Sequence, residues 1–400
     1  MKKLIPREYY LRKVEPFIGK DLIKVIVGQR RVGKSYFLLQ IMELIKRQDS
    51  ESNIIYINKE LYDFDEIKDY HDLVRYVKDR EDGQKKNSVF IDEIQDIKRF
   101  EKALRSFQAE GKYDIYCTGS NANLLSSDLA TYLSGRYIEM RIFSLSYPEF
   151  LKFHEIDNQR ESLLKYIRYG GLPYLVNLPL EDNVVYDYLK NVYNTILLKD
   201  VVARYQIRNI SFLQDLVKFL ADNVGNLYSA KKISDYLKSQ KINISTNVIL
   251  NYLNHLAAAF FINKVPRTDI IGKKIFEFGE KVYFEDLGLR HTIIGYHQRD
   301  INKVLENLVF THLMISGFDV TVGKLNGHEI DFVCIRGNEK IYIQVVYQIT
   351  EEKTWDREFG NLLQIKDNYP KIVVSMDEMI GAQYEGISHI HLLNFLSEYR

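Results

Sequence analysis

The sequence is poor in cysteine and carries almost no net charge. Its two cysteines, Cys117 and Cys334, lie far apart inside apolar, strand-like runs. This pattern argues against a disulfide framework or a cysteine-rich metal site and predicts buried thiols in a reducing compartment. The 55 basic and 54 acidic residues give a formal charge of +1. Any nucleic-acid surface must therefore be a local patch rather than a property of the whole chain.

Long apolar runs are absent as well. The longest, residues 256–262, is far shorter than the roughly 20 residues that a membrane-spanning helix needs. Residues 1–8 begin with basic side chains but lack the apolar core of a signal peptide. We therefore expect a soluble, cytoplasmic protein with no membrane partner. Its 400 residues and 46% hydrophobic content are enough for two or three domains.

One short stretch carries the strongest signal in the chain. Residues 28–35 read GQRRVGKS and fit the pattern G-x-x-x-x-G-K-[ST] at every fixed position. An apolar, β-branched run at 22–27 precedes it, and apolar residues at helical spacing follow Lys34. A chance match is the alternative, but the strand and helix on either side are the context that this motif requires. We predict a phosphate-binding loop.

The residue types in this loop have separate roles. Gly28 and Gly33 let the backbone turn sharply and approach phosphate closely, and successive N–H groups then form an anion-binding nest at a helix start. Lys34 is expected between the β- and γ-phosphates, and the Ser35 hydroxyl on Mg²⁺. The predicted ligands are ATP and Mg²⁺, and the predicted nucleotide contacts are Gly28, Gln29, Arg30, Arg31, Val32, Gly33, Lys34, Ser35 and Tyr36.

A second motif is acidic. Residues 88–93 read SVFIDE, an apolar run that ends in two carboxylates. The run reads as a buried strand. Asp92 is expected to support the Mg²⁺ shell through water, opposite Ser35. Glu93 is expected to orient and polarise the attacking water, because phosphoryl transfer depends mainly on positioning and charge stabilisation. The Asp-Glu pair favours hydrolysis over nucleotide binding alone.

Two further segments contribute candidate catalytic residues. The strand at 114–121 ends in Thr118, Ser120 and Asn121, any of which could hydrogen-bond the γ-phosphate or the water. We favour Ser120 and Asn121, and the alternative is that they cap a following helix. Arg136 precedes a strand at 137–142 and would reach the γ-phosphate in its own subunit or across an interface as an arginine finger. The alternative for Arg136 is an ion pair with a core carboxylate.

Several phrases together resemble a known family. GQRRVGKS, VFIDEIQ, YCTGSNANLL, LSGRYIEM and SLSYPEF, followed by YGGLPYLV, LLKDVVARYQIRN and EKVYFEDLGLR, are similar to a group of bacterial and archaeal AAA-type ATPases. Members of that group carry a winged-helix segment and a C-terminal restriction-endonuclease-like domain of undefined role. The resemblance covers almost the whole chain. It implies an α/β P-loop NTPase fold, ATP hydrolysis and compatibility with homo-oligomers, but it supplies no substrate.

The middle of the chain favours a helical module. We predict a P-loop AAA-type ATPase domain at 1–165, a helical linker and winged helix at 166–295, and a degenerate PD-(D/E)xK nuclease-like domain at 296–400. The third helix of the winged helix offers asparagines to DNA but no cation, so phosphate affinity would come from residues around it. A packing module without DNA contact is the alternative. The surrounding cations are Lys231, Lys232, Lys264, Arg267, Lys273, Lys274 and Lys281.

The last domain has an incomplete nuclease motif. A helix with Glu306 and a strand with Glu329 and Asp331 resemble the nuclease core, in which acids hold Mg²⁺ and a lysine activates water. Gln344-Val345-Val346 stands where that core has Glu-x-Lys, and Lys340 lies too far along the strand to replace the lysine. We predict that cleavage is absent or much weakened, while binding of DNA or a partner protein is retained.

These features predict a Mg²⁺-dependent ATP hydrolase whose nucleotide state controls DNA or partner binding by its C-terminal domains. Two alternatives remain open: an ATP-regulated, metal-dependent DNA nuclease, and a nucleotide-dependent switch in a protein assembly that contains no nucleic acid.

Overall fold

The computed structural model describes residues 4–122, 135–270, 279–349, 352–378 and 383–398. By internal contacts the chain forms two compact units: Met1–Phe143 with Ala258–Phe260, and Ser144–Ala257 with Phe261–Arg400. Within the described ranges, none of the helices combines the length and the apolar character needed to cross a bilayer.

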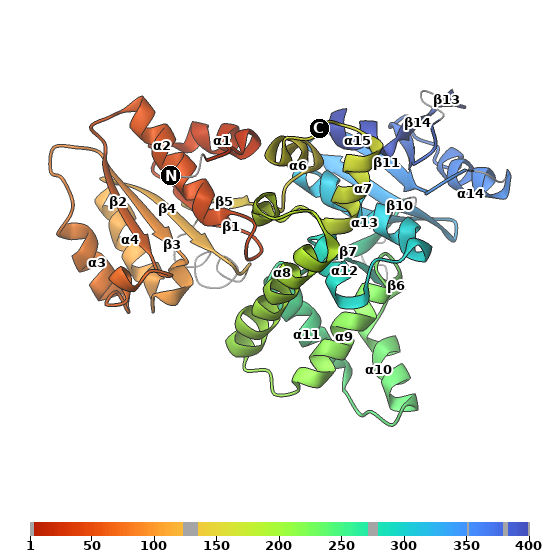
Figure 1. Ribbon diagram of the computed structural model, residues 1–400, viewed down its shortest axis with the longest axis horizontal. Coiled ribbons are helices and arrows are strands. Elements are labelled where there is room, and N and C mark those ends of the chain that lie inside the picture. Colours follow the sequence, from red (N-terminus) through yellow and green to blue (C-terminus); the bar gives the residue numbers. More distant parts are fainter. Residues whose placement is uncertain (1–3, 123–134, 271–278, 350–351, 379–382, 399–400) are drawn as a thin grey trace. The chain divides into compact units, whose positions relative to one another are not determined.

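A parallel sheet forms the centre of the first unit (Figure 1). Its strand order is β2-β3-β4-β1-β5, so β4 is inserted between the strand before the GQRRVGKS loop and the strand that ends at Asp92. Parallel pairing brings the carboxyl ends of the strands to one edge, where α/β proteins bind ligands. This sheet confirms the predicted α/β class. The strands are β1 (Ile23–Val27), β2 (Asn53–Asn58), β3 (Asn87–Asp92), β4 (Tyr113–Gly119) and β5 (Tyr137–Arg141).

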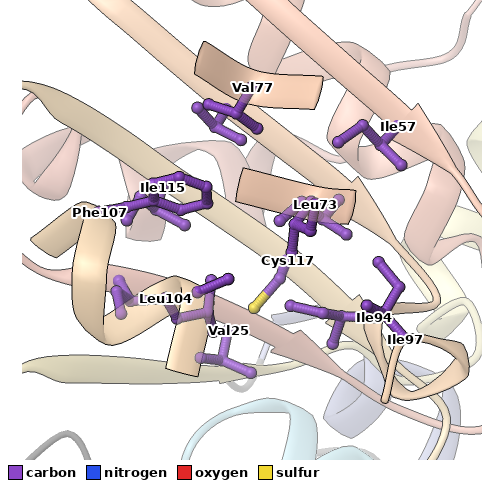
Figure 2. Close-up of a cluster of buried hydrophobic side chains, with 14 of the residues drawn as sticks. Val25, Ile57, Leu73, Val77, Ile94, Ile97, Leu104, Phe107, Ile115 and Cys117 are labelled. Atoms are coloured by element: carbon purple, nitrogen blue, oxygen red, sulfur yellow. The ribbon is translucent and has the colours of Figure 1, made fainter. Parts of the chain in front are cut away.

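Helices cover both faces of this sheet, which is why β1, β3 and β4 are buried along their whole length. Side chains of α3 and α4 meet the odd-numbered residues of β1 and β4 in one apolar cluster (Figure 2). Cys117 lies in this cluster, and burial raises the pKa of its thiol to about 12. The predicted buried, unpaired cysteines are confirmed. The helices are α1 (Glu8–Val14), α2 (Lys34–Gln48), α3 (Tyr70–Lys78) and α4 (Phe100–Glu110).

The second unit contains a mixed sheet of nine strands in the order β13-β14-β12-β11-β10-β9-β7-β8-β6. The β7–β8 ribbon lies within the segment predicted as a winged helix, and it continues into the C-terminal sheet because β7 also pairs in parallel with β9. The strands are β6 (Leu227–Tyr228), β7 (Ile262–Asp269), β8 (Glu280–Phe284), β9 (Asp319–Leu325), β10 (His328–Arg336), β11 (Glu339–Val345), β12 (Lys371–Ser375), β13 (Gln383–Tyr384) and β14 (Ile387–His391).

Helices of the second unit surround this sheet and form the helical module that precedes it. Three consecutive helices, α9 to α11, lie within the segment where the sequence predicts the winged helix. Their identification as a winged helix, and the boundaries at 165 and 295, stay predictions. The helices are α6 (Tyr147–His154), α7 (Arg160–Tyr169), α8 (Asp182–Thr195), α9 (Ile210–Asp222), α10 (Ala230–Ser239), α11 (Thr246–Ala258), α12 (Leu287–Ile294), α13 (Ile301–Ile315), α14 (Glu352–Leu363) and α15 (Leu392–Glu398).

The two glycines of the YGGLP phrase have a packing role in this unit. The Asp286 carboxylate accepts hydrogen bonds from the Gly171 and Leu289 amides at 2.8 and 3.2 Å. It therefore caps α12 and also holds the glycine turn in place. A Cβ atom on Gly170 would lie 2.2 Å from that carboxylate. The glycine turn therefore packs closely against the start of α12 and connects α7 to it.

Candidate active site

The GQRRVGKS loop connects β1 to α2 with a backbone path that needs glycine. Gly28 has a φ of +153°, and a Cβ atom there would lie 2.2 Å from the Ile142 carbonyl oxygen. Gly33 has a φ of +95° and immediately precedes the first residue of α2. Both conformations disfavour any side chain. The loop therefore presents its backbone at the positive end of a helix, as an anion site requires.

Lys34 lies over this loop. Its side chain is buried, and its ammonium donates hydrogen bonds to the carbonyl oxygens of Gly28 and Gln29, both at 3.1 Å. Such bonds hold the ammonium at the loop, where phosphate oxygens can take the place of the carbonyls. The Lys34 position agrees with its predicted role, which stays a prediction.

Arg7 stabilises the backbone of the loop, a role that the sequence analysis did not identify. This buried guanidinium donates hydrogen bonds to the carbonyl oxygens of Val32 and Phe143, at 3.2 and 2.8 Å. A lone arginine in a short N-terminal segment belongs to no motif, so only the folded chain reveals its contact. The other side chains of the loop diverge: Arg30 is buried and pairs with Glu60 at 3.2 Å, whereas Tyr36 is exposed.

Asp92 and Glu93 stand at the end of β3, and Thr118 of the neighbouring β4 organises both. The Thr118 hydroxyl donates a hydrogen bond to the Asp92 carboxylate and accepts one from the Glu93 amide at 2.9 Å. Glu93 has a left-handed φ of +55°, and its carboxylate accepts a hydrogen bond from the Gln95 side chain. Thr118 therefore positions the acidic pair, and the phosphate-sensing role of Ser120 and Asn121 stays a prediction.

Burial raises the pKa of Asp92, against the opposing effects of the Ser35 and Thr118 hydroxyls and of Lys34. The charged Asp92 carboxylate is thus poorly solvated. The same observation places the Ser35 hydroxyl at this carboxylate, so the two predicted Mg²⁺-site residues are brought together. A cation that is held by both would stabilise the ionised form.

Ser120 and Asn121 follow β4 at the same edge of the sheet. Both are buried, and the Ser120 hydroxyl has no hydrogen-bond partner among the residues that the structure describes. A buried, unsatisfied hydroxyl beside a phosphate loop fits a group that completes its hydrogen bonding with a ligand. The alternative helix-cap role concerns a helix predicted at 122–125, most of which lies outside the described residues.

Arg136 lies at the other edge of the sheet. In the parallel register Tyr137 pairs with Ile23 and Arg141 with Val27, so Arg136 precedes the strand at its amino end. Five residues at about 3.3 Å each separate it from the loop edge by roughly 16 Å of backbone. The register thus places the Arg136 backbone at the end of β5 away from the loop. A contact of Arg136 with the γ-phosphate, in its own subunit or across an interface, stays a prediction.

The residues at this edge fit Mg²⁺ and a nucleoside triphosphate. They comprise a glycine-dependent loop at a helix start, a buried lysine, a hydroxyl–carboxylate pair, a second carboxylate and an unsatisfied hydroxyl. Gly28, Lys34, Ser35, Asp92, Glu93 and Ser120 supply these groups. Such a set can bind polyphosphate, hold Mg²⁺ and orient water.

We expect Asp92→Asn to raise the melting temperature of the nucleotide-free protein at pH 7.5. Because the folded-state pKa is raised, the wild-type protein loses stability as pH rises from the unfolded aspartate pKa of about 4 through the folded value. Asparagine removes that loss. The gain should shrink as pH is lowered towards the unfolded aspartate pKa of about 4, which thermal scans from pH 8 to about pH 4 will measure.

The exposed Asp79 on the first unit supplies the control, since Asp79→Asn should show no such pH-dependent gain. A variant at position 92 that is less stable than wild type at pH 7.5, or whose gain is constant with pH, contradicts this account of the carboxylate.

A second cluster of charged residues lies in the nine-stranded unit. The Lys281 ammonium, from β8, is 2.7 Å from carboxylates of both Glu306 and Glu329 and 3.9 Å from that of Asp331. Burial alone lowers the pKa of Lys281, but the three carboxylates outweigh it and raise the pKa above its usual value. Lys281 was predicted on a basic rim, and that prediction is wrong because only 2% of its side chain is exposed.

Gln344 is built into the same cluster. Its side-chain oxygen accepts a hydrogen bond from the Asp331 amide at 2.6 Å, and its side-chain nitrogen donates to Glu358 at 2.8 Å. Burial and the neighbouring Glu306 raise the pKa of Asp331 well above the usual range, although Lys281 opposes them. Among the described residues, no group of three acidic, histidine or cysteine side chains has the arrangement of a metal site.

The helical module exposes the side chains predicted to face DNA. Asn247, Asn251 and Asn254 of α11 are exposed, and so are Lys231 and Lys232 of α10. Lys273 and Lys274 lie outside the described residues. Lys264 and Arg267 of β7 are only partly exposed, and Lys264 pairs with Glu280. DNA contact stays a prediction.

Two family models match the chain: one described as an AAA domain at residues 20–151, and a domain of unknown function, DUF8612, at residues 160–300. An uncharacterized protein of Haemophilus influenzae is 37% identical over 403 residues, 99% of each chain. An uncharacterized protein of Methanocaldococcus jannaschii is 32% identical over 360 residues, 85% of this chain and 78% of the relative. Both relatives match the chain well beyond its AAA domain.

Solved structures resemble the chain more distantly. The Aeropyrum pernix ORC1 protein in complex with DNA is 12% identical with a TM-score of 0.34, over 73% of this chain and 93% of that one. A Saccharomyces cerevisiae Hsp104–casein complex is 13% identical with a TM-score of 0.31, over 66% and 52%. The family match shows the AAA domain, and the two relatives show the family.

Proposed function

The chain carries an AAA domain and belongs to the same family as its relatives in Haemophilus influenzae and Methanocaldococcus jannaschii. We propose that it is a Mg²⁺-dependent ATP hydrolase. In this proposal its nucleotide state controls the binding of DNA or a partner protein by its C-terminal part. The observation that supports the proposal best is the gathering of the loop, the Asp92–Glu93 pair and Ser120 at one edge of the sheet.

Each residue has a defined task in this proposal. The loop amides and Lys34 bind the phosphates, while Ser35 and Asp92 would hold Mg²⁺, which would supply positive charge to the phosphates. Glu93 accepts a hydrogen bond from the attacking water and so aligns it with the γ-phosphate. Thr118 keeps the Asp92 carboxylate and the Glu93 backbone in place, and the Ser120 hydroxyl donates to the γ-phosphate. Asn121 assists at the same edge.

Control of DNA binding is tested with the full-length protein in gel shifts across a salt series. Glu93→Gln protein loaded with ATP is compared with wild-type protein loaded with ADP. Affinities that differ between the two states and fall steeply with salt support the proposal. Absence of a shift at low salt in both states removes DNA from it and favours the nucleotide-dependent switch within a protein assembly.

The Lys281 cluster keeps a second candidate function under consideration, that of an ATP-regulated, metal-dependent nuclease. The sequence has valine instead of lysine at the motif position two residues after Gln344. The fold nevertheless brings Lys281 to the carboxylates from another strand. Incubation of plasmid DNA with Mg²⁺ or Mn²⁺ tests this directly. Cleavage by wild-type protein that is lost in Asp331→Ala would establish the nuclease, and intact plasmid with both proteins would exclude it.

A further inference from the structure

The phosphate loop contacts a turn that lies more than two hundred residues away in sequence. Gln29, the second residue of the loop, has no exposed surface, and its side-chain nitrogen donates a hydrogen bond to the Phe260 carbonyl oxygen at 3.1 Å. Residues Ala258–Phe260 belong to the first compact unit. The turn is therefore part of the surroundings of the nucleotide site.

The same turn reaches the ends of β4 and β5. The Ala122 amide, just after Ser120 and Asn121, donates to the Ala258 carbonyl oxygen at 2.8 Å. The Arg141 guanidinium, at the end of β5, lies 4.9 Å from the centroid of the Phe260 ring. The turn thus contacts the phosphate loop, the chain after the predicted sensor residues and the last residue of β5.

Two features indicate that this contact is held under constraint. Phe260 has a left-handed φ of +53°, a conformation that aromatic residues rarely adopt unless packing imposes it. Its ring is buried in the apolar core of the first unit. The Gln29 side-chain oxygen is buried without a hydrogen-bond partner among the described residues, so the loop side of the contact is incompletely satisfied.

We propose that the Ala258–Phe260 turn is a positioning element of the nucleotide site and links occupancy of the phosphate loop to the chain on either side of the turn. The inference rests on the proposed function. When phosphates draw the loop amides inward, Gln29 moves with them and shifts the turn, and the covalent chain passes this shift to α11 and β7. By thermodynamic linkage, if the bound nucleotide stabilises the turn, a substitution that loosens the turn weakens nucleotide binding.

The test uses full-length protein and a non-hydrolysable ATP analogue with Mg²⁺. Phe260→Leu keeps most of the buried volume but removes the aromatic face over Arg141. Phe107→Leu makes the same change elsewhere in the same core and serves as the matched control. We expect Phe260→Leu to weaken analogue binding about tenfold, and Phe107→Leu to change it less than about twofold at a comparable loss of melting temperature.

Hydrogen exchange of the 258–260 amides provides the second readout. Analogue binding should slow exchange there in wild-type protein, and Gln29→Leu, which removes the donor to Phe260, should abolish that slowing. Equal binding losses in the two phenylalanine variants, or exchange at the turn that ignores the analogue, would overturn the inference and leave the ATPase proposal intact. Wild-type protein that fails to bind the analogue would overturn both.

Discussion

Glu93→Gln is expected to lower kcat for ATP hydrolysis about 100- to 10,000-fold, the range that a positioned acid–base group contributes. Glutamine keeps the size of the side chain and its bond with Gln95, but it cannot polarise the attacking water. Because Glu93 has no predicted role in holding phosphate, ATP affinity should change little. Steady-state release of phosphate and equilibrium binding of a fluorescent ATP analogue will separate the two effects.

Glu110→Gln provides a control for this substitution, since Glu110 is an exposed carboxylate of the same unit that pairs with Lys78 on the surface. It should leave both kcat and affinity unchanged. Hydrolysis at the wild-type rate by the Glu93 variant would show that another residue orients the water. Loss of ATP binding would instead place Glu93 among the nucleotide contacts.

Lys281→Met is expected to lower the free energy of unfolding by about 3–5 kcal/mol, because it leaves buried carboxylates without their counter-ion. The pH dependence of this effect follows from the raised pKa of Lys281. The carboxylates raise the folded-state pKa of Lys281, so its stabilising effect is fully present below its ordinary value of about 10.5 and is lost only as pH rises through the folded value. Urea denaturation at pH 7.5 therefore reports the whole effect.

Two variants sharpen this second test. Lys264→Met removes a lysine of the neighbouring strand whose 3.8 Å pair with Glu280 is partly exposed, and it should cost less than about 1 kcal/mol. The double variant Lys281→Met/Glu306→Gln removes one uncompensated carboxylate and should recover part of the loss. A single Lys281→Met variant as stable as wild type would contradict the counter-ion role. Recovery of its stability by millimolar Mn²⁺ would show that the carboxylates can hold a divalent cation.

Much of the first unit could be predicted from the sequence because its signals are local. The GQRRVGKS loop, its strand and helix, and the SVFIDE strand each fit within a few consecutive residues. Parallel pairing then brings their carboxyl ends together without further information. The sequence could therefore predict that one edge of the sheet brings together Lys34, Ser35, Asp92, Glu93 and Ser120. Their catalytic roles stay predictions.

The residues that sequence analysis missed act through contacts between distant segments. Arg7 reaches Val32 and Phe143, and Phe260 reaches Gln29, with no motif to mark either contact. Lys281 looked like a surface cation because its burial depends on carboxylates contributed by α13 and β10. The register of β5 places Arg136 at the end of the strand away from the loop, a position that the sequence alone does not give, and its contact with phosphate stays a prediction.

The central claim is that ATP is bound at the GQRRVGKS loop and hydrolysed there. It is tested most directly by Mg²⁺-dependent release of inorganic phosphate from ATP, measured side by side with wild-type and Lys34→Ala protein. The account predicts steady release by wild type, none when Mg²⁺ is chelated, and loss of both release and ATP affinity in the variant. No release from wild-type protein, or equal nucleotide affinity in both proteins, would contradict it.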